Sequence, residues 1–192
     1  ESNVNERYLL EWLSSNAGRG YVTYHEDSDK FSLSPEQAAV FARENEPTCI
    51  QGLMQGVVGQ FVKEDVAIDV FKTGRGRPWG EHHECCFCGT ERFFRPAYAG
   101  HLLDEWIPAM TGVEEKLKMG AKVADIGCGL GTSSMLMAEQ YPNSTIHAFD
   151  FHEPSIEEAK KRAEEKGLSN LEFFVSDAAA IPNESYDLAC IF

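Results

Sequence analysis

Three glycines and one aspartate are concentrated in the segment VADIGCGLGTSS, residues 123–134. Gly127, Gly129 and Gly131 alternate with other residues directly after a short apolar run, and Asp125 stands two residues before the first glycine. A glycine-rich turn between a strand and a helix lets backbone amides approach a ligand closely, and the helix N-terminus favours negative charge. The segment therefore predicts a small-molecule site.

The spacing of the glycines separates this site from a dinucleotide site. Enzymes that bind nicotinamide dinucleotides use G-x-G-x-x-G, whereas the pattern here is G-x-G-x-G and Thr132 occupies the place of the third glycine. Asp125 would repel a pyrophosphate but suits a cationic ligand. A nicotinamide dehydrogenase is therefore a rival interpretation that these residues disfavour.

Two further acids follow the next two predicted strands. Asp150 lies 19 residues after Gly131, where a carboxylate can accept both hydroxyls of a ribose. Asp177 follows the third strand, in position to accept from the exocyclic amine of a purine. Each acid could instead cap the helix that follows it. Ribose, adenine and a cationic amino-acid end together describe S-adenosylmethionine.

The motifs DIGCGLG, HAFDFH and VSDAAAIP, with YDLACIF after them, resemble the cofactor-binding half of class I S-adenosylmethionine-dependent methyltransferases. The resemblance covers about residues 119–192 and implies S-adenosylmethionine as the cofactor. For the methionine part of the cofactor, it implies that Gly127, Gly129 and Gly131 line it and that Asp125 helps to hold its ammonium group. For the adenosine part, it implies that Asp150 holds the ribose and that Phe151 lies against the adenine. Asp177 and Ala178 would face the adenine edge.

The order of the predicted elements agrees with that fold. Apolar and helical patterns predict strands at 122–126, 145–149, 171–175 and 186–191, with helices at 132–140 and 155–166. Ser155 and Glu158 form a capping-box pattern at the start of the second helix. We expect an α/β fold with a Rossmann-like, doubly wound parallel sheet.

The two ends of the sequence suggest a fragment. The family sheet has seven strands, whereas the fourth predicted strand ends with the chain at Phe192, and the chain begins at Glu1 without a methionine. We expect a class I fold that is truncated at its C-terminus. This expectation puts the activity of the fragment alone in question.

The part of the chain before the glycine-rich segment is mainly helical. The patterns predict a helix at 6–14, two short strands at 21–24 and 30–33, and a helix from Pro35 to Arg43 that Ser34 caps. Helices are also predicted within 49–71, at 91–110 and at 113–118, with a loop at 73–80. We expect a partial winged-helix-like segment at 1–48, a helical connector or substrate-side region at 49–118, and the incomplete S-adenosylmethionine-binding domain at 119–192.

The helix and hairpin at the start resemble the winged-helix region that precedes the catalytic domain in many small-molecule methyltransferases. In those enzymes this region serves dimer contacts or encloses the substrate, so the resemblance allows for a homodimer. Residues 1–48 carry nine acidic and four basic side chains, a net charge of −5, and the whole chain has a net charge of −14. This acidity argues against nucleic acid as a partner.

The composition and the apolar runs of the sequence indicate where in the cell the protein is expected. Hydrophobic residues make up 43% of the chain, as in an ordinary globular protein, and no run of 18 apolar residues occurs. No charged-then-apolar leader opens the sequence. We expect a cytoplasmic protein that does not bind a membrane.

A second group of reactive side chains lies in the sequence HHECCFC, residues 82–88. A structural zinc site normally has two separated pairs of ligands, and only one cluster is present, so we predict no metal. A reactive or substrate-side thiol and a structural cluster both remain open for Cys85, Cys86 and Cys88. His82, His83 and His101 are candidate general bases, and Arg75 and Arg77 are candidate anion-binding residues, although a surface or packing role is the simpler interpretation for each.

The sequence thus favours an enzyme, an S-adenosylmethionine-dependent methyltransferase that acts on a small-molecule acceptor by in-line transfer. It identifies neither the acceptor atom nor a catalytic residue. The alternative from another class is a winged-helix transcriptional regulator with a sensing or degenerate cofactor-binding domain.

Overall fold

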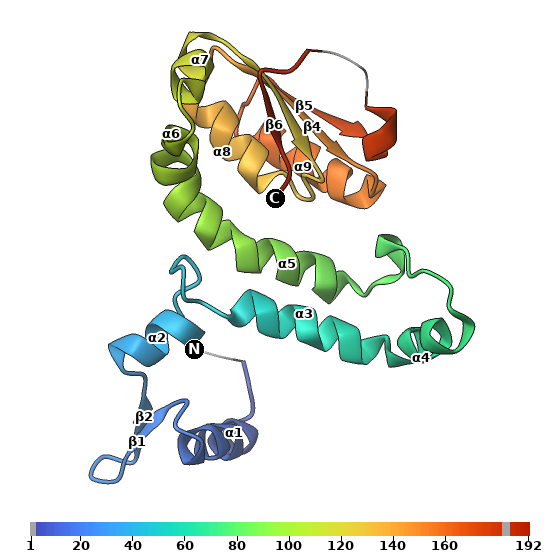
Figure 1. Cartoon of the computed structure of the whole chain (residues 1–192). Coiled ribbons are helices and arrows are strands. Elements are labelled where there is room, and N and C mark those ends of the chain that lie inside the picture. Colours follow the sequence, from blue (N-terminus) through green and yellow to red (C-terminus); the bar gives the residue numbers. More distant parts are fainter. Residues whose placement is uncertain (1–2, 182–184) are drawn as a thin grey trace. The chain divides into compact units, whose positions relative to one another are not determined.

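A computed structural model describes residues 3–181 and 185–192, and its elements are shown in Figure 1. The chain forms two compact units, residues 1–51 and residues 52–192. The three-part division expected from the sequence stays a prediction. Within the described ranges, no helix combines the length and the apolar character that crossing a membrane requires.

The first unit has the predicted order of helix, hairpin and helix. Helix α1 (Glu6–Gly18) begins after Asn5, whose side chain accepts from the Arg7 amide at 3.1 Å. Strands β1 (Thr23–His25) and β2 (Lys30–Ser32) pair antiparallel. Helix α2 (Pro35–Phe41) begins with a capping box in which Ser34 and Gln37 satisfy each other's backbone amides. The predicted cap at Ser34 is therefore confirmed.

The second unit begins with seven helical segments. They are α3 (Gln51–Val62), α4 (Glu64–Thr73), the short 3-10 turn η1 (Trp79–Glu81), α5 (Glu84–Ala97), the π-helical segment η2 (Tyr98–Trp106), α6 (Ile107–Ala109) and α7 (Val113–Met119). The helix predicted from residue 91 begins seven residues earlier, because His83 caps it by accepting from the Cys85 amide at 3.2 Å. The HHECCFC segment therefore opens a helix.

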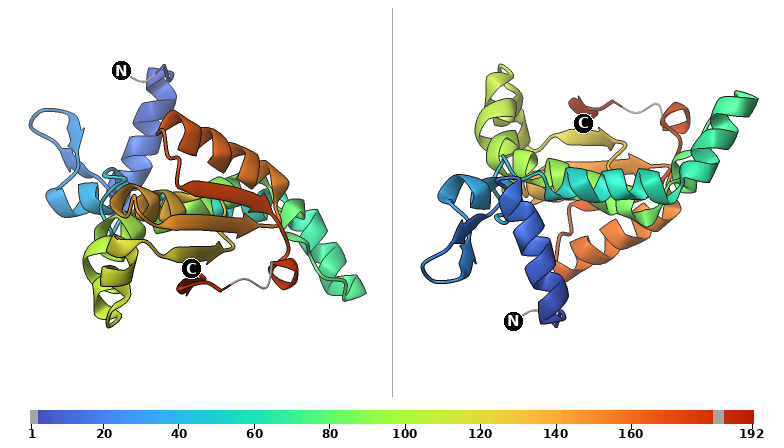
Figure 2. Two further views of the ribbon diagram at one scale, coloured as in Figure 1. Left: turned by 90° about the horizontal axis from the view of Figure 1, so that it is seen from above. Right: turned by 90° about the horizontal axis from the view of Figure 1, so that it is seen from below.

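Helices α3 and α5 approach each other closely and lie side by side in Figures 1 and 2. A Cβ atom built on Gly52 would lie 2.3 Å from the Phe93 amide nitrogen, and one built on Gly89 would lie 2.5 Å from the Gly56 amide nitrogen. Only glycine permits this backbone-to-backbone contact. The glycines that weaken α3 as a helix in isolation are thus the residues that hold α5 in place.

The remainder of the second unit is an α/β sheet. Strands β3 (Lys122–Ile126), β4 (Thr145–Asp150), β5 (Leu171–Val175) and β6 (Leu188–Cys190) are all parallel, in the order β5-β4-β3-β6. Helix α8 (Thr132–Gln140) joins β3 to β4, helix α9 (Glu153–Glu165) joins β4 to β5, and the 3-10 turn η3 (Ala178–Ala180) follows β5. This arrangement confirms the predicted Rossmann-like fold.

The strand order creates a reversal between β3 and β6. The chain moves from β3 outward to β4 and β5 and then returns to the other side of β3. In open parallel sheets, ligands bind outside the carboxyl ends of the strands at such a reversal. The glycine-rich segment follows β3, and Phe192 follows β6, so this point of the sheet is where the predicted site must lie.

The core of the unit lies between the sheet and its helices. Val123, Ile146, Met137 and Ile156 are fully buried, and Leu117 of α7 joins them. Burying such a side chain stabilises a fold by roughly 1.5–3 kcal/mol. Helix α9 lies along one face of the sheet (Figure 2), and its contacts with β4 and β5 fix the frame that carries the site.

Two sequence predictions need correction here. Helix α9 begins at Glu153, with Pro154 in its first turn, so the capping box predicted at Ser155 is wrong. Ser155 is buried inside the first turn, where its Oγ lies 2.8 Å from His152 Nδ1. Strand β6 is shorter than predicted, and Pro182 of the VSDAAAIP motif lies outside the described residues.

Candidate functional site

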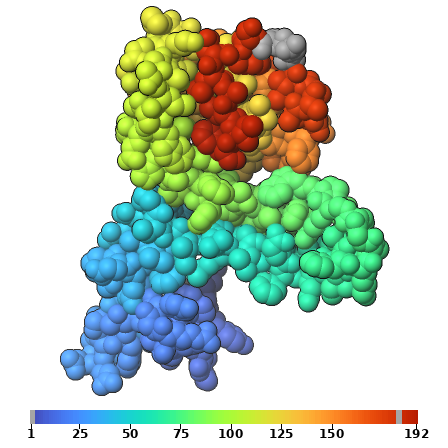
Figure 3. Space-filling model, viewed as in Figure 1, coloured from blue at the N-terminus to red at the C-terminus, as the bar shows by residue number. Residues whose placement is uncertain are grey.

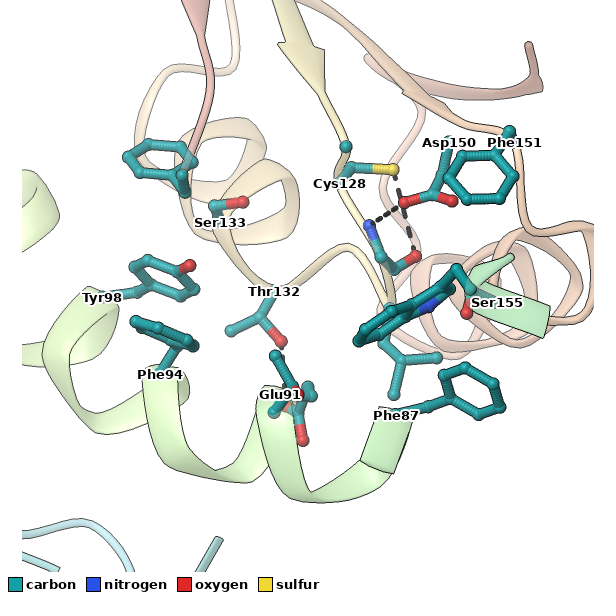
Figure 4. A pocket seen from close by; sticks show the side chains of 16 residues that line it. Phe87, Glu91, Phe94, Tyr98, Cys128, Thr132, Ser133, Asp150, Phe151 and Ser155 are labelled. Atoms are coloured by element: carbon teal, nitrogen blue, oxygen red, sulfur yellow. Dashed lines mark hydrogen bonds between the residues drawn. The ribbon is translucent and has the colours of Figure 1, made fainter. Parts of the chain in front are cut away.

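A cavity of about 220 Å³ lies at the carboxyl ends of the strands (Figure 4). Its walls come from the loop after β3, the start of α8, the end of β4, the start of α9, the residue after β6, and one face of α5. The sixteen lining residues are Trp79, Phe87, Thr90, Glu91, Phe94, Tyr98, Gly127, Cys128, Gly129, Leu130, Thr132, Ser133, Asp150, Phe151, Ser155 and Phe192.

The glycine loop is held open by its backbone conformation. Gly127, Gly129 and Gly131 have φ values of +76°, +54° and +76°, which side chains other than glycine rarely adopt. The amides of Gly127 and Cys128 both donate to the Phe149 carbonyl, at 2.8 and 3.0 Å. Gly127 and Gly129 line the cavity, and a Cβ on either would meet no atom within 4 Å. Their missing side chains leave space at the cavity wall.

Gly131, the third glycine of the loop, lies in a different environment. Gly131 does not line the cavity, and a Cβ there would lie 2.7 Å from two ring carbons of Phe173 and 3.2 Å from the Ala159 methyl. Phe173 belongs to β5 and Ala159 to α9. This glycine therefore lies at a close approach between helix and sheet, and its contact with the methionine part of the cofactor stays a prediction.

Asp125 is almost completely enclosed beneath the loop. Its side chain is on β3 and is 1% exposed, and its Oδ2 accepts hydrogen bonds from the hydroxyls of Ser133 and Ser134 at 2.7 and 2.6 Å. Among the described residues, no donor reaches its Oδ1. Burial raises the pKa of Asp125, while the two serine hydroxyls act in the opposite direction. The site therefore contains a buried carboxylate oxygen that accepts no hydrogen bond from the part of the chain that the structure describes.

Replacement of Asp125 with asparagine is expected to stabilise the fold at neutral pH. Because burial raises the pKa of Asp125 above the ordinary value of 3.8, the ionised carboxylate costs stability once the pH rises through that raised pKa. Asparagine keeps an acceptor for the serines and removes the charge. We expect the free energy of unfolding at pH 7 to rise above that of the unchanged chain. The gain should disappear below about pH 3.8.

Urea denaturation at pH 7 and at low pH would measure this difference. Glu172→Gln on the exposed face of β5 is the matched control, and it should change little at either pH. A destabilised Asp125→Asn chain at pH 7 would mean that the ionised carboxylate is favoured in the folded state.

Asp150 lies at the end of β4 and lines the cavity. Its Oδ2 accepts from the Gly129 amide at 2.9 Å and its Oδ1 accepts from the His152 amide at 2.8 Å. A carboxylate has about four acceptor positions, so both oxygens can accept further donors from a ligand. The side chain thus braces the glycine loop and faces the cavity beside Phe151, as Figure 4 shows.

Asp177 and Ala178 lie apart from this group. Neither lines the cavity, both are exposed, and the Asp177 carboxylate accepts from the Ala179 amide at 2.8 Å at the start of η3. This is the capping arrangement that the sequence left open for Asp177. Their contact with an adenine edge stays a prediction.

Sequence reasoning predicted a helix from residue 91 but missed its first residues and its place as one wall of the cavity. Phe87, the adjacent pair Thr90 and Glu91, Phe94 and Tyr98 recur at intervals of three or four residues, which places them on one face of α5 and the start of η2. The signal was present in the sequence, but it became visible only with the true start of α5 at Glu84.

Glu91 connects this wall to the two helices of the sheet. Its side chain is 13% exposed, and its Oε1 accepts from the Thr132 hydroxyl at 3.0 Å and lies 3.9 Å from a guanidinium nitrogen of Arg162. Thr132 begins α8 and Arg162 belongs to α9. One carboxylate therefore fixes α5 over the glycine loop.

The charges that face the cavity are all negative. Among the described residues that line it, Glu91 and Asp150 are the charged ones, and neither lysine nor arginine is present. Six of the lining residues are aromatic: Trp79, Phe87, Phe94, Tyr98, Phe151 and Phe192. Such a cavity favours a cationic or neutral ligand with apolar parts over a phosphate-bearing one.

The histidines near the start of α5 and one of its cysteines make local contacts, while Cys88 is exposed and Cys85 is half-buried. His83 caps the helix, the buried Cys86 Sγ accepts from Gln60 Nε2 at 3.4 Å, and the His82 ring lies 5.2 Å from that of Trp79. In the part of the chain that the structure describes, no three His, Cys, Asp or Glu side chains are grouped to hold a metal ion.

The other candidate residues also lie outside the cavity lining. His101 Nδ1 is 3.1 Å from a carboxylate oxygen of Glu105, and the Arg75 guanidinium pairs with Asp69 and Glu81. Arg77 donates to Gln60. The structure does not bring these side chains to the glycine loop.

Two known families match separate parts of the chain. Residues 117–192 match a family described as a methyltransferase domain, and residues 1–43 match one described as an Rv2258c-like winged HTH domain. These matches cover the glycine loop, both cavity-lining strand ends and the helix-and-hairpin unit.

Individual relatives are methyltransferases of several kinds. Aklanonic acid methyltransferase DauC from Streptomyces sp. (strain C5) is 40% identical over 72 residues, which are 36% of this chain and 33% of that protein. Sterol 24-C-methyltransferase ERG6A from Gibberella zeae is 31% identical over 127 residues, 64% of this chain and 30% of that protein. The chain spans less than half the length of the curated relatives it matches.

Solved structures resemble the whole chain. Mitomycin 7-O-methyltransferase superposes with a TM-score of 0.65 at 15% identity, over 98% of this chain and 57% of that one. An O-methyltransferase family protein from Burkholderia thailandensis gives a TM-score of 0.61 at 17% identity, over 97% and 56% of the two chains. At these identities the likeness shows a shared fold.

Proposed function

We propose that this chain, which carries the cofactor-binding part of a class I S-adenosylmethionine-dependent methyltransferase domain behind a winged-helix region, methylates a small-molecule acceptor. S-adenosylmethionine supplies, when bound, an electrophilic methyl group on a positively charged sulfur. The protein's task is to align the acceptor with that group in line, and proximity and orientation can supply much of the rate.

The residues present fit this cofactor. The unpartnered Oδ1 of Asp125 offers a buried acceptor for an ammonium group near the start of α8. Gly127 and Gly129 leave open space at the cavity wall for the methionine part. Asp150 retains acceptor positions for two ribose hydroxyls, and Phe151 presents an exposed ring for the adenine.

The observation that carries the proposal is the charge of the cavity. Asp150 and Glu91 face it, Asp125 lies beneath it, and no basic side chain lines it among the described residues. A sulfonium and an ammonium group are attracted to such a site, whereas the pyrophosphate of a nicotinamide dinucleotide is repelled. The same negative field disfavours phosphate-rich acceptors such as nucleic acids.

We propose that Gly131 acts on this site through packing, by letting α8 approach Phe173 and Ala159. Asp177 and Ala178 are proposed to reach the adenine edge only at the rim of the site.

Residues 1–51 are proposed to enclose the substrate or to contribute to a homodimer, as the winged-helix match suggests. A cytoplasmic location belongs to the same proposal.

Isothermal titration calorimetry with S-adenosylhomocysteine, the product form of the cofactor, tests the proposal directly. We expect saturable binding with one site per chain, because the residues that line the cavity come from one compact unit. NAD is the control ligand and should produce no heat of binding, because the charged side chains that line the cavity among the described residues, Glu91 and Asp150, are carboxylates that repel a pyrophosphate.

The outcomes separate the two classes of function. Binding of NAD, or of neither ligand to a folded chain, would overturn the methyltransferase proposal. Binding of a double-stranded DNA fragment without any binding of S-adenosylhomocysteine would favour the winged-helix regulator.

A further inference from the structure

One end of the cavity is formed mainly by aromatic rings. The Phe94 and Tyr98 rings of neighbouring helical turns lie 6.2 Å apart between centroids and are nearly parallel, at 17°. The Phe192 ring lies 5.2 Å from that of Tyr98, and the Trp106 ring lies behind both at 6.3 Å. Phe94, Trp106 and Phe192 are 44%, 39% and 47% exposed, so this end reaches the surface. In Figure 3 the dark red C-terminal segment lies beside the yellow-green segment that carries η2.

This aromatic end is separate from the end that contains Asp150. Figure 4 shows Phe94 and Tyr98 beside Ser133 on one side of Thr132, and Asp150, Phe151 and Phe87 on the other side. The adenosine part of the cofactor is assigned to the Asp150 side. The Phe94 side therefore remains for the second ligand, which must come within reach of the methionine part near the glycine loop.

The polar groups at the aromatic end are few and uncharged. Tyr98 lines the cavity, and Figure 4 shows its hydroxyl on the side of Ser133. Burial raises the pKa of Tyr98, so its hydroxyl stays protonated and can donate as well as accept. Ser133 donates its own proton to Asp125 and keeps acceptor capacity.

We infer that Phe94, Tyr98 and Phe192 bind the methyl acceptor as a flat, uncharged aromatic ring that carries a hydroxyl group. The rings offer offset-stacked and edge-to-face contacts to a flat partner, and Tyr98 and Ser133 offer one donor and one acceptor to the hydroxyl. An acceptor with a carboxylate or phosphate is disfavoured, since neither lysine nor arginine lines the cavity among the described residues to pair with it. This inference rests on the proposed cofactor position.

The probe is 1-naphthol, titrated by its fluorescence into the chain saturated with S-adenosylhomocysteine. Decahydro-1-naphthol, which has the same carbon skeleton and hydroxyl without aromatic rings, is the competing ligand. We expect 1-naphthol to bind and decahydro-1-naphthol to displace it at least about tenfold less effectively, because the stacking contacts are lost.

Two variants and one control test whether the aromatic ring of 1-naphthol binds at Phe94 and Tyr98. Phe94→Leu keeps apolar volume but removes the ring, and Tyr98→Phe removes only the hydroxyl; each should weaken 1-naphthol binding about tenfold. Phe71→Leu, at a side chain that is 92% exposed and outside the cavity, is the matched control and should change nothing. The affinity for S-adenosylhomocysteine should stay within about twofold in all three variants.

The two proposals fail in different ways. Loss of S-adenosylhomocysteine binding by the unchanged chain would overturn the proposed function and with it this inference. Normal S-adenosylhomocysteine binding without 1-naphthol binding, with equal affinity for the saturated alcohol, or with unchanged affinity in Phe94→Leu would overturn this inference alone.

Discussion

Asp150→Ala is expected to reduce the affinity for S-adenosylhomocysteine by about a hundredfold or more. The carboxylate is proposed to accept both ribose hydroxyls, and a hydrogen bond to a charged group contributes about 1.5–3 kcal/mol. Two such bonds correspond to about two to four powers of ten in the dissociation constant. The same side chain holds the Gly129 amide at 2.9 Å, so the glycine loop also loses its brace.

Calorimetric titration of the variant measures this loss, and Asp150→Asn divides it into parts. Asparagine retains one oxygen that can accept from the Gly129 amide but loses the second acceptor, so we expect an intermediate affinity. Glu172→Ala, which removes an exposed carboxylate from the neighbouring strand β5, is the control for the change in net charge. A folded Asp150→Ala chain that binds S-adenosylhomocysteine within threefold of the unchanged chain would remove Asp150 from the ribose site.

Gly131→Ala is expected to lower the free energy of unfolding by about 2–5 kcal/mol. An alanine at a φ of +76° costs about 1–2 kcal/mol. Its Cβ would also lie 2.7 Å from the Phe173 ring, and such overpacking costs about 1–3 kcal/mol. Phe173 is buried in β5, and Gly131 begins the turn into α8, so neither side can move freely.

Gly127→Ala is the matched control, because Gly127 has the same φ of +76° but no atom within 4 Å of a built Cβ. It should lose only about 1–2 kcal/mol. Urea denaturation of both variants isolates the contribution of the contact with Phe173. Equal stability of the two variants would show that Gly131 is required for its backbone conformation alone.

The comparison of Gly131→Ala with Gly127→Ala separates glycines that the sequence analysis had placed in one ligand-binding group. The glycine pattern identified the loop, and the positive φ values of Gly127, Gly129 and Gly131 explain why glycine occurs at each position. Only the structure divides them, because two of the glycines face the cavity and the third faces Phe173. Phe173 lies 42 residues further along the chain, and no local pattern connects it to the loop.

The two aspartates predicted at strand ends, Asp150 and Asp177, also differ in whether they line the cavity. Asp150 was predicted at a strand end and lies there, with both carboxylate oxygens bound to amides near the cavity. Asp177 was predicted from the same kind of position, yet its carboxylate caps η3 and does not line the cavity. The sequence rule places a carboxylate at the end of a strand but leaves the direction of its side chain open.

Local patterns in the sequence were sufficient to predict the order of strands and helices from residue 122 onward, the parallel sheet and the position of the glycine loop. Each depends on apolar periodicity, glycine and capping patterns within a few neighbouring residues. Only the tertiary structure decided what faces the loop: α5 forms a wall, and Glu91 contacts Thr132 across 41 residues of sequence. That contact depends on the close packing of α3 and α5 at Gly52 and Gly89 and on the fold of the sheet, which are long-range interactions.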